Sequence, residues 1–137
     1  MAFTGPIEDR LAIRERIEAY ADAVFRRDAD DWIACWAEDA SWSLMGMTLT
    51  GREIIKVTWQ GAMSAFPLAA FFAQPGSIEI AGDTARSRSF TQEILTTEDG
   101  GLRRVVGRYD DTLARVDGVW LFTSRSYTVL HDRTETH

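Results

Sequence analysis

The sequence is poor in the residues that mark several common functional classes. Its 137 residues include one cysteine, one lysine and two histidines, and its formal charge is −6. A single cysteine forms no internal disulfide, and no histidine pair, cysteine cluster or carboxylate triad has the spacing of metal ligands. Affinity for nucleic acids comes largely from clustered Lys and Arg, so we expect no nucleic-acid partner and no bound metal.

Long hydrophobic runs are also missing. No stretch reaches the roughly 18 apolar residues of a membrane-spanning helix, and residues 1–10 lack the basic leader and apolar core of a signal peptide. No glycine-rich loop follows a predicted strand, so nothing indicates a nucleotide cofactor. We therefore expect a cytoplasmic protein with no membrane partner and no cofactor, in which Cys35, between two tryptophans, is a buried and inert thiol.

The composition is that of an ordinary globular domain. Hydrophobic residues make up 45% of the chain and charged residues 26%. A chain of this length has room for one domain. We place that domain at residues 1–137, with a core over about 8–130 and a polar, frayed tail at 131–137.

The first half of the chain predicts helices. One begins near Pro6 and has an apolar stripe at helical spacing, formed by Ile13, Ile17, Tyr20 and Val24. A short second helix would contain Trp32 and Trp36. Residues 41–49 are predicted to be extended.

A third helix is predicted after this extended segment. Thr50 and Glu53 have the spacing of a capping box, and an apolar face with Trp59 and Met63 follows until Pro67 ends the helix. The apolar stretch 68–76 is expected to close one end of the core.

The second half of the chain changes to the pattern of an antiparallel meander. Short turn signals separate segments rich in β-branched and aromatic residues, which predict strands near 84–97, 102–116 and 119–130. Strands of this length twist strongly. The sheet is therefore expected to curve around the three helices.

Several short motifs occur in a fixed order along this pattern. They include Asp9 to Ile13, Trp36 to Ala40, Thr50 to Ile54, Gly107 to Asp111, and Asp117 to Trp120. Together with the order of elements, they resemble the SnoaL-like branch of the nuclear transport factor 2-like superfamily. The resemblance implies an α+β cone, in which three helices pack on a strongly curved, mainly antiparallel sheet around an apolar pocket.

Members of this superfamily include ketosteroid isomerases, scytalone-type dehydratases and polyketide cyclases, so the resemblance implies two alternative catalytic sites. Asp22 matches the helix aspartate of dehydratase-like members, but the position of their histidine falls near Ala70. Tyr20 matches the helix tyrosine of isomerase-like members, but the position of their aspartate base falls near Leu44. Neither pair is complete in this sequence. The two histidines, His131 and His137, lie in the tail and are expected in solvent.

Tyr20 and Asp22 are nevertheless the candidate catalytic residues. Tyr20 lies on the apolar stripe, so it is either a pocket residue or a core residue whose hydroxyl finds a partner. Asp22 lies at the margin of the stripe, so it either faces the pocket or forms a solvated pair with Arg26. Both alternatives remain open at this point.

The hairpin at Asp117-Gly118 predicts which strand residues face the pocket. An unbroken register places Tyr109, Ser124 and Ser126 on the pocket face and Arg125 and Tyr127 on the outer face. A one-residue bulge would exchange part of this assignment. The residues predicted to bind the ligand are Trp42, Leu44, Trp59, Met63, Phe71, Phe72, Tyr109, Ser124 and Ser126.

These observations lead to competing functions. The first is a cofactor-free lyase, isomerase or cyclase that acts on a small hydrophobic ring compound. The second is a binding or accessory protein that holds such a compound without chemistry, and the incomplete catalytic pairs favour it. The small subunit of a ring-hydroxylating dioxygenase is a third alternative, which the short chain disfavours.

A homodimer is also expected. The outer face of the sheet would expose Val116, Val119, Leu121 and Val129, which is more apolar surface than a monomer normally shows.

Overall fold

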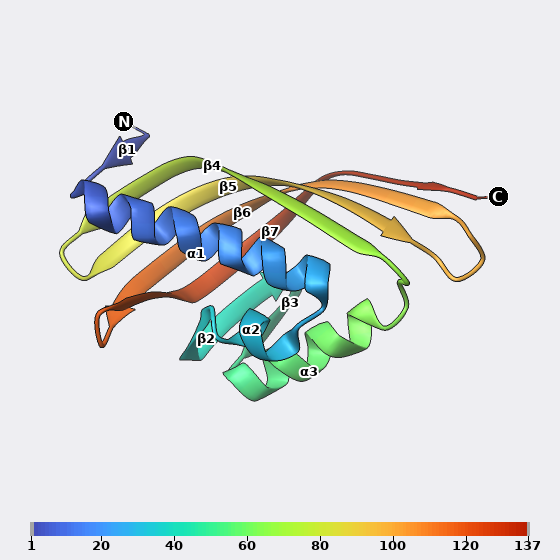
Figure 1. The fold of residues 1–137 in the computed structure, drawn as a ribbon, viewed down its shortest axis with the longest axis horizontal. Helices are drawn as coiled ribbons and strands as arrows, with labels where there is room; N and C mark the ends of the chain where they lie inside the picture. The colour runs from blue at the N-terminus through green and yellow to red at the C-terminus, as the bar shows by residue number, and fades with distance from the viewer. Residues whose placement is uncertain (1, 137) are drawn as a thin grey trace.

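The computed structural model describes residues 2–136, which form three helices and one seven-stranded sheet. The strand order is β1-β4-β5-β6-β7-β2-β3. The pairs β1–β4 and β2–β7 are parallel and the other neighbours are antiparallel. The helices lie along one side of the curved sheet (Figure 1). The expected α+β class, with helices on a curved and unclosed sheet, is therefore confirmed.

The helices are α1 (Ile7–Arg26), α2 (Ala29–Ile33) and α3 (Arg52–Met63). The strands are β1 (Phe3–Thr4), β2 (Trp36–Leu44), β3 (Met47–Thr50), β4 (Ala69–Ala81), β5 (Thr84–Thr96), β6 (Leu102–Val116) and β7 (Val119–Glu135). The predicted stripe of α1 is buried in the core. In the described part of the chain, the helices are too short or too polar to cross a bilayer.

Two predicted details of the helices are wrong. Trp36 is not helical, because the chain leaves α2 to join the sheet: the Cys35 carbonyl accepts a hydrogen bond from the Phe122 amide, and Trp36 pairs with Phe122. The capping box does not form either. Thr50 remains paired with Ser41 in β3, and Gly51, with φ of 97°, makes the turn into α3.

The stretch expected to close the core is a strand. β4 was not predicted because Pro75 interrupts its pattern, and proline is excluded from the interior of a sheet. It is tolerated here because β1 pairs with β4 only at Ile78 and Glu79, which leaves the rest of that edge open. The predicted frayed tail is also wrong, since β7 remains paired with β6 up to Glu135. His137 lies outside the described residues.

The register of the β6–β7 hairpin changes along its length. Near the turn it follows the prediction, with Leu113 opposite Phe122. The next pair joins Thr112 to Ser124, so Thr123 is an extra residue in β7. This β-bulge exchanges the two faces of the strand beyond it.

The bulge decides which side chains enter the core. Arg125 and Tyr127 reach the concave face, where Arg125 is 1% exposed. Ser124 and Ser126 lie instead along a shallow groove on the convex face. A second shift follows between Val106 and Gly107, where β7 has one further extra residue.

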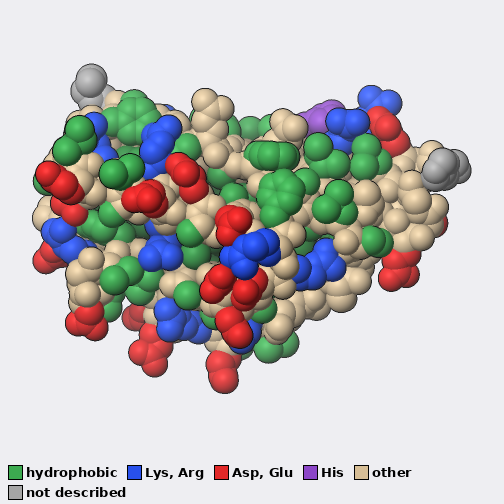
Figure 2. All heavy atoms as spheres, viewed as in Figure 1, with side chains coloured by type: hydrophobic (Ala, Val, Ile, Leu, Met, Phe, Trp, Pro, Cys, Tyr) green, Lys and Arg blue, Asp and Glu red, His purple; other side chains and the backbone are tan. Residues whose placement is uncertain are grey.

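The convex face keeps some of the expected apolar exposure. Val116 and Val119 are about two-fifths exposed, whereas Leu121 packs partly against the core. Val129 is 44% exposed as well, but it lies at the cavity of the concave side. On the side drawn in Figure 2, hydrophobic side chains gather over β4 beside the end of α1.

Candidate functional site

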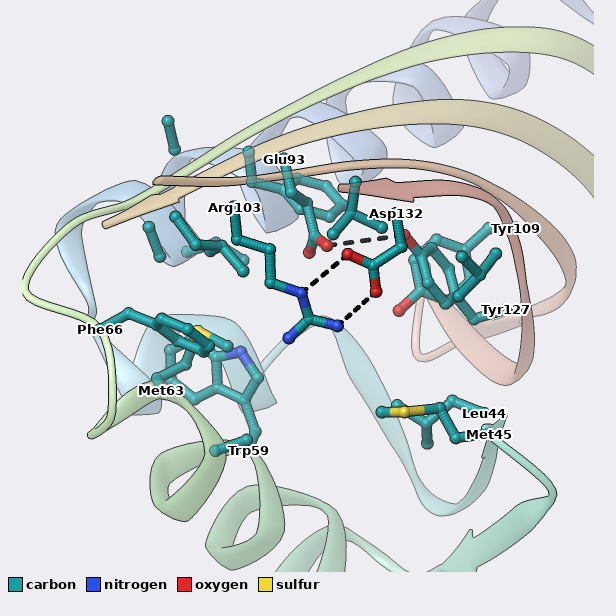
Figure 3. A pocket seen from close by; sticks show the side chains of 18 of the residues that line it. Leu44, Met45, Trp59, Met63, Phe66, Glu93, Arg103, Tyr109, Tyr127 and Asp132 are labelled. Atoms are coloured by element: carbon teal, nitrogen blue, oxygen red, sulfur yellow. Dashed lines mark hydrogen bonds and ion pairs between the residues drawn. The ribbon is translucent and has the colours of Figure 1, made fainter. Parts of the chain in front are cut away.

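A cavity of about 180 Å³ lies between α3, the C-terminal half of α1 and the concave face of the sheet. Figure 3 shows that its polar side chains come from the strands and face apolar side chains of α3 and the β2–β3 turn. Its lining includes most of the residues predicted from the sequence, namely Tyr20, Trp42, Leu44, Trp59, Met63, Phe71 and Tyr109.

Aromatic stacking fixes the apolar wall. Trp59 of α3 stacks on Trp32 of α2, with ring centroids 4.5 Å apart and planes 10° apart. Trp42 of β2 meets the edge of Trp32 at 5.5 Å. Because Trp32 is itself fully buried, the two cavity tryptophans are held in place before any ligand arrives.

Two buried tyrosines form the floor. The hydroxyls of Tyr20 and Tyr109 lie 3.4 Å apart, and Trp42 Nε1 donates a hydrogen bond of 3.1 Å to the Tyr109 hydroxyl. Burial raises the pKa of Tyr20 to about 12 and raises the pKa of Tyr109 as well. Both phenols therefore stay protonated at neutral pH and can act as hydrogen-bond donors.

A buried ion pair supports this floor. Arg125 donates two hydrogen bonds to the Asp111 carboxylate, at 2.8 and 3.0 Å. The Arg125 guanidinium carbon also lies 3.8 Å from the centroid of the Tyr109 ring and 4.4 Å from that of Tyr20. This cation–π contact orients both rings from below.

The most unusual group in the cavity is the Glu93 carboxyl of β5. Burial raises the pKa of Glu93 to about 7, and Asp132 adds to the rise, while Arg103 and Tyr127 oppose it. The Tyr127 hydroxyl donates a long hydrogen bond of 3.5 Å to Glu93 Oε2. Glu93 is therefore poised to exchange a proton near neutral pH.

Gly107 of β6 makes room for Tyr127. A Cβ atom at position 107 would lie 2.2 Å from the Tyr127 hydroxyl oxygen and 2.3 Å from its Cζ. No side chain larger than hydrogen fits under this ring. Gly107 thus lets Tyr127 lie against the strand with its hydroxyl next to Glu93.

Arg103 of β6 and Asp132 of β7 form a second ion pair in the cavity lining. Arg103 Nε donates to one Asp132 oxygen at 3.0 Å, and Nη2 donates to the other at 2.6 Å. Both side chains are about one-third exposed. Figure 3 shows the guanidinium reaching into the cavity towards the apolar wall.

Four predicted site residues do not belong to this cavity, and Asp22, Ser124 and Ser126 are three of them. Asp22 is exposed and forms an ion pair of 2.8 Å with Arg26, so the solvated alternative is correct. Ser124 and Ser126 were misplaced because of the bulge at Thr123.

Phe72 is a fourth exception. It is 52% exposed and packs on Phe25 of α1 rather than in the cavity. Its neighbour Phe71 takes the cavity position, because successive strand residues point to opposite sides.

The positions that would complete the two expected catalytic pairs also line the cavity. Ala70 and Leu44 are both in its wall and carry no titratable group. His131 is exposed and is not part of the lining. Over residues 2–136, no group of three or more His, Cys, Asp or Glu side chains is arranged to hold a metal ion.

The comparisons with known proteins agree with this architecture. The family model of the SnoaL-like domain matches residues 6–126. No match was found among proteins of curated function. A Novosphingobium aromaticivorans protein proposed to be a scytalone dehydratase is similar in structure, with a TM-score of 0.87, 22% identity and coverage of 96% of this chain and 89% of its own.

Two further structures show the same fold. A proposed aromatic ring hydroxylase from N. aromaticivorans has a TM-score of 0.87 and 27% identity, and covers 98% of this chain and 96% of its own. Hexachlorocyclohexane dehydrochlorinase LinA-type3 from Novosphingobium barchaimii has a TM-score of 0.83 and 17% identity. The match covers 93% of this chain and 90% of the dehydrochlorinase. The chain therefore belongs to the SnoaL-like domain family, within the nuclear transport factor 2-like superfamily.

Proposed function

We propose that this chain binds a small, largely apolar ring compound in the cavity and moves a proton on it, as a lyase or isomerase that needs no cofactor. The observation that carries the proposal is the Glu93 carboxyl, which lines the cavity and has its pKa raised to about 7 by burial. A general acid or base works best when its pKa lies near the working pH.

The cavity walls favour a flat, apolar ligand. Trp42 and Trp59 offer aromatic surface, and Met63 and Phe66 add apolar surface on the same side. An apolar cavity of roughly 150 Å³ is large enough for benzene. The present cavity, at about 180 Å³, thus suits a ring with few substituents.

Glu93 would act as the base in such a reaction. Its carboxylate takes a proton from a carbon atom of the ligand, and the electron pair of the broken C–H bond forms a double bond. In a lyase a leaving group departs with its bonding electrons, whereas in an isomerase the double bond shifts and the proton returns at another carbon. The Tyr109 hydroxyl can donate a hydrogen bond to a ligand oxygen that gains negative charge.

The comparisons support elimination chemistry. The names of two structural neighbours describe a dehydratase and a dehydrochlorinase, and both names denote eliminations. In this chain Ala70 and Leu44 leave both expected catalytic pairs without a partner. The base in our proposal is therefore Glu93, on β5, rather than a group at either of these two positions.

A model reaction tests the proposal without the natural substrate. The neutral bicyclic compound 5-nitrobenzisoxazole opens when a base removes its one acidic C–H proton and the N–O bond breaks. We expect the protein to accelerate this opening with a rate that rises through an apparent pKa near 7. Glu93→Gln should abolish the acceleration, and Glu79→Gln, which removes an exposed carboxylate far from the cavity, should leave it unchanged.

The same assay separates the enzyme from a binding protein. The incomplete expected pairs favour a binding protein as the second candidate function. If the compound binds but its ring opens equally fast with Glu93→Gln, the cavity only binds ligands. If it neither binds nor reacts, the proposed ligand site is wrong.

A further inference from the structure

The charged side chains of the cavity consist of one ion pair and one further carboxyl. Its lining contains three, namely Glu93, Arg103 and Asp132. Arg103 is the cation among them, and its Nε and Nη2 atoms are already engaged with the two oxygens of Asp132. The pair is therefore internally neutral, and Glu93 is left as the group that sets the net charge of the cavity.

This arrangement disfavours an anionic ligand. A carboxylate in the cavity would compete with Asp132 for Arg103, and it would lie in an apolar space with a second carboxyl, Glu93. Moving a charge out of water is unfavourable unless it gains a partner of opposite charge. A neutral ligand meets no such penalty, because the Glu93 carboxyl and the Tyr127 hydroxyl can hydrogen-bond to an uncharged oxygen or nitrogen.

The geometry of the strands keeps Asp132 in place. Val105 pairs with Asp132 across the β6–β7 ladder, and Arg103 lies two residues before Val105. Arg103 and Asp132 therefore project from the same face of neighbouring strands as a diagonal pair. The second register shift, before Gly107, is what brings Asp132 to this face.

We propose that the Arg103–Asp132 pair makes the cavity selective for neutral ligands over carboxylates, with Asp132 as the residue that determines this specificity. The proposal rests on the cavity being the ligand site, as proposed above. It adds the charge class of the ligand.

Two probes of nearly identical shape and different charge test this inference. trans-Cinnamamide is neutral, and trans-cinnamate is its carboxylate counterpart at neutral pH. We expect isothermal titration calorimetry to show that the unmodified protein binds the amide at least tenfold more tightly. Asp132→Asn should free Arg103 and reduce or reverse the preference.

Matched variants exclude indirect effects. Asp110→Asn removes the same charge from an ion pair within β6, Asp110 with Arg108 at 3.0 Å, and should keep the preference because neither residue lines the cavity. Arg103→Gln leaves Asp132 unneutralised, so it should strengthen discrimination against cinnamate while the amide still binds. This second variant keeps the inference testable if Asp132→Asn fails to fold.

The outcomes distinguish the two proposals. Equal binding of both probes by the unmodified protein, or an unchanged preference in folded Asp132→Asn, would overturn the charge selectivity, while the ligand site would stand. Absence of binding of either probe to every variant would overturn both proposals together.

Discussion

Tyr20 and Asp22 are only two residues apart in α1, yet one lies in the cavity and the other on the surface. Tyr20 is 2% exposed and lines the cavity, while Asp22 lies in solvent with Arg26. Residues two positions apart in a helix differ by roughly 200° around its axis, so Tyr20 and Asp22 cannot both face the cavity. The helical period thus predicted the burial of Tyr20 correctly, whereas Asp22 does not face the cavity as the resemblance to dehydratase-like sites implied.

Glu93 shows what strand periodicity can and cannot predict. Thr91 and Leu95, two residues to either side, are buried on the concave face, so alternation alone would have placed Glu93 there too. Its raised pKa could not be predicted, because it depends on the walls that α3 and β7 build around the carboxyl.

The same carboxyl makes a prediction about stability. The pKa of Glu93 is raised to about 7 in the folded protein, so the unfolded chain releases this proton first as the pH increases. The folded protein is therefore most stable with respect to this group at low pH, where the carboxyl is protonated in both states. This stability is lost as the pH rises to about 7. We therefore compare the free energy of unfolding of Glu93→Gln with that of the unmodified protein. The difference should favour the variant by roughly 2 kcal/mol more at pH 8 than at pH 5.

Urea unfolding at both pH values measures this difference. The exposed Glu79→Gln variant should show no comparable change between them. A Glu93→Gln variant whose relative stability is the same at pH 5 and pH 8 would contradict a buried carboxyl in the cavity.

At the scale of the elements, the turns were predictable and the irregularities were not. The hairpin at Asp117-Gly118 formed with the predicted pairs next to it, because a two-residue turn fixes the register locally. The bulge at Thr123 lies beyond these pairs, and the two-residue turn does not specify it. It moved Arg125 and Tyr127 into the core and Ser124 out of it.

Contact between neighbouring strands also gives Gly107 its importance. Gly107→Ala places a methyl group within 2.4 Å of the Tyr127 ring, so the ring must move. We expect a loss of stability of about 1–3 kcal/mol, and a slower opening of 5-nitrobenzisoxazole because the Tyr127 hydroxyl leaves Glu93.

Gly61→Ala in α3 is the matched control. No atom lies within 4 Å of its added Cβ, and the substitution should raise stability by roughly 0.5–1 kcal/mol because alanine favours helix. Urea unfolding and the ring-opening rate measure both variants. Normal stability and rate in Gly107→Ala would show that the Tyr127 position is not needed.

At the scale of the whole molecule, the convex face of the sheet exposes several apolar side chains to solvent. Phe90 and Val106, on the same face of β5 and β6, are 45% and 38% exposed, and Val116 and Val119 lie exposed at the hairpin end. We propose that two copies of the chain associate through this face, because apolar patches on a sheet usually mark an interface.

Light scattering after size-exclusion chromatography measures this association. We expect a dimer at micromolar concentration, and Phe90→Asp should convert it to a monomer. Val57→Asp, on the exposed side of α3, introduces the same charge elsewhere and should leave the dimer intact. A monomeric unmodified protein would exclude this assembly.

Because of the bulge at Thr123, the side chains that β7 turns towards the core depend on the number of residues in the strand. Loss of a single residue from an exposed loop usually leaves a protein functional, but loss of Thr123 would exchange the two faces of the strand from Ser124 to Val129. Arg125 would turn to solvent and its partner Asp111 would remain as an unpaired charge in the core. The ion pair in the core therefore depends on the number of residues in this strand as well as on their identity.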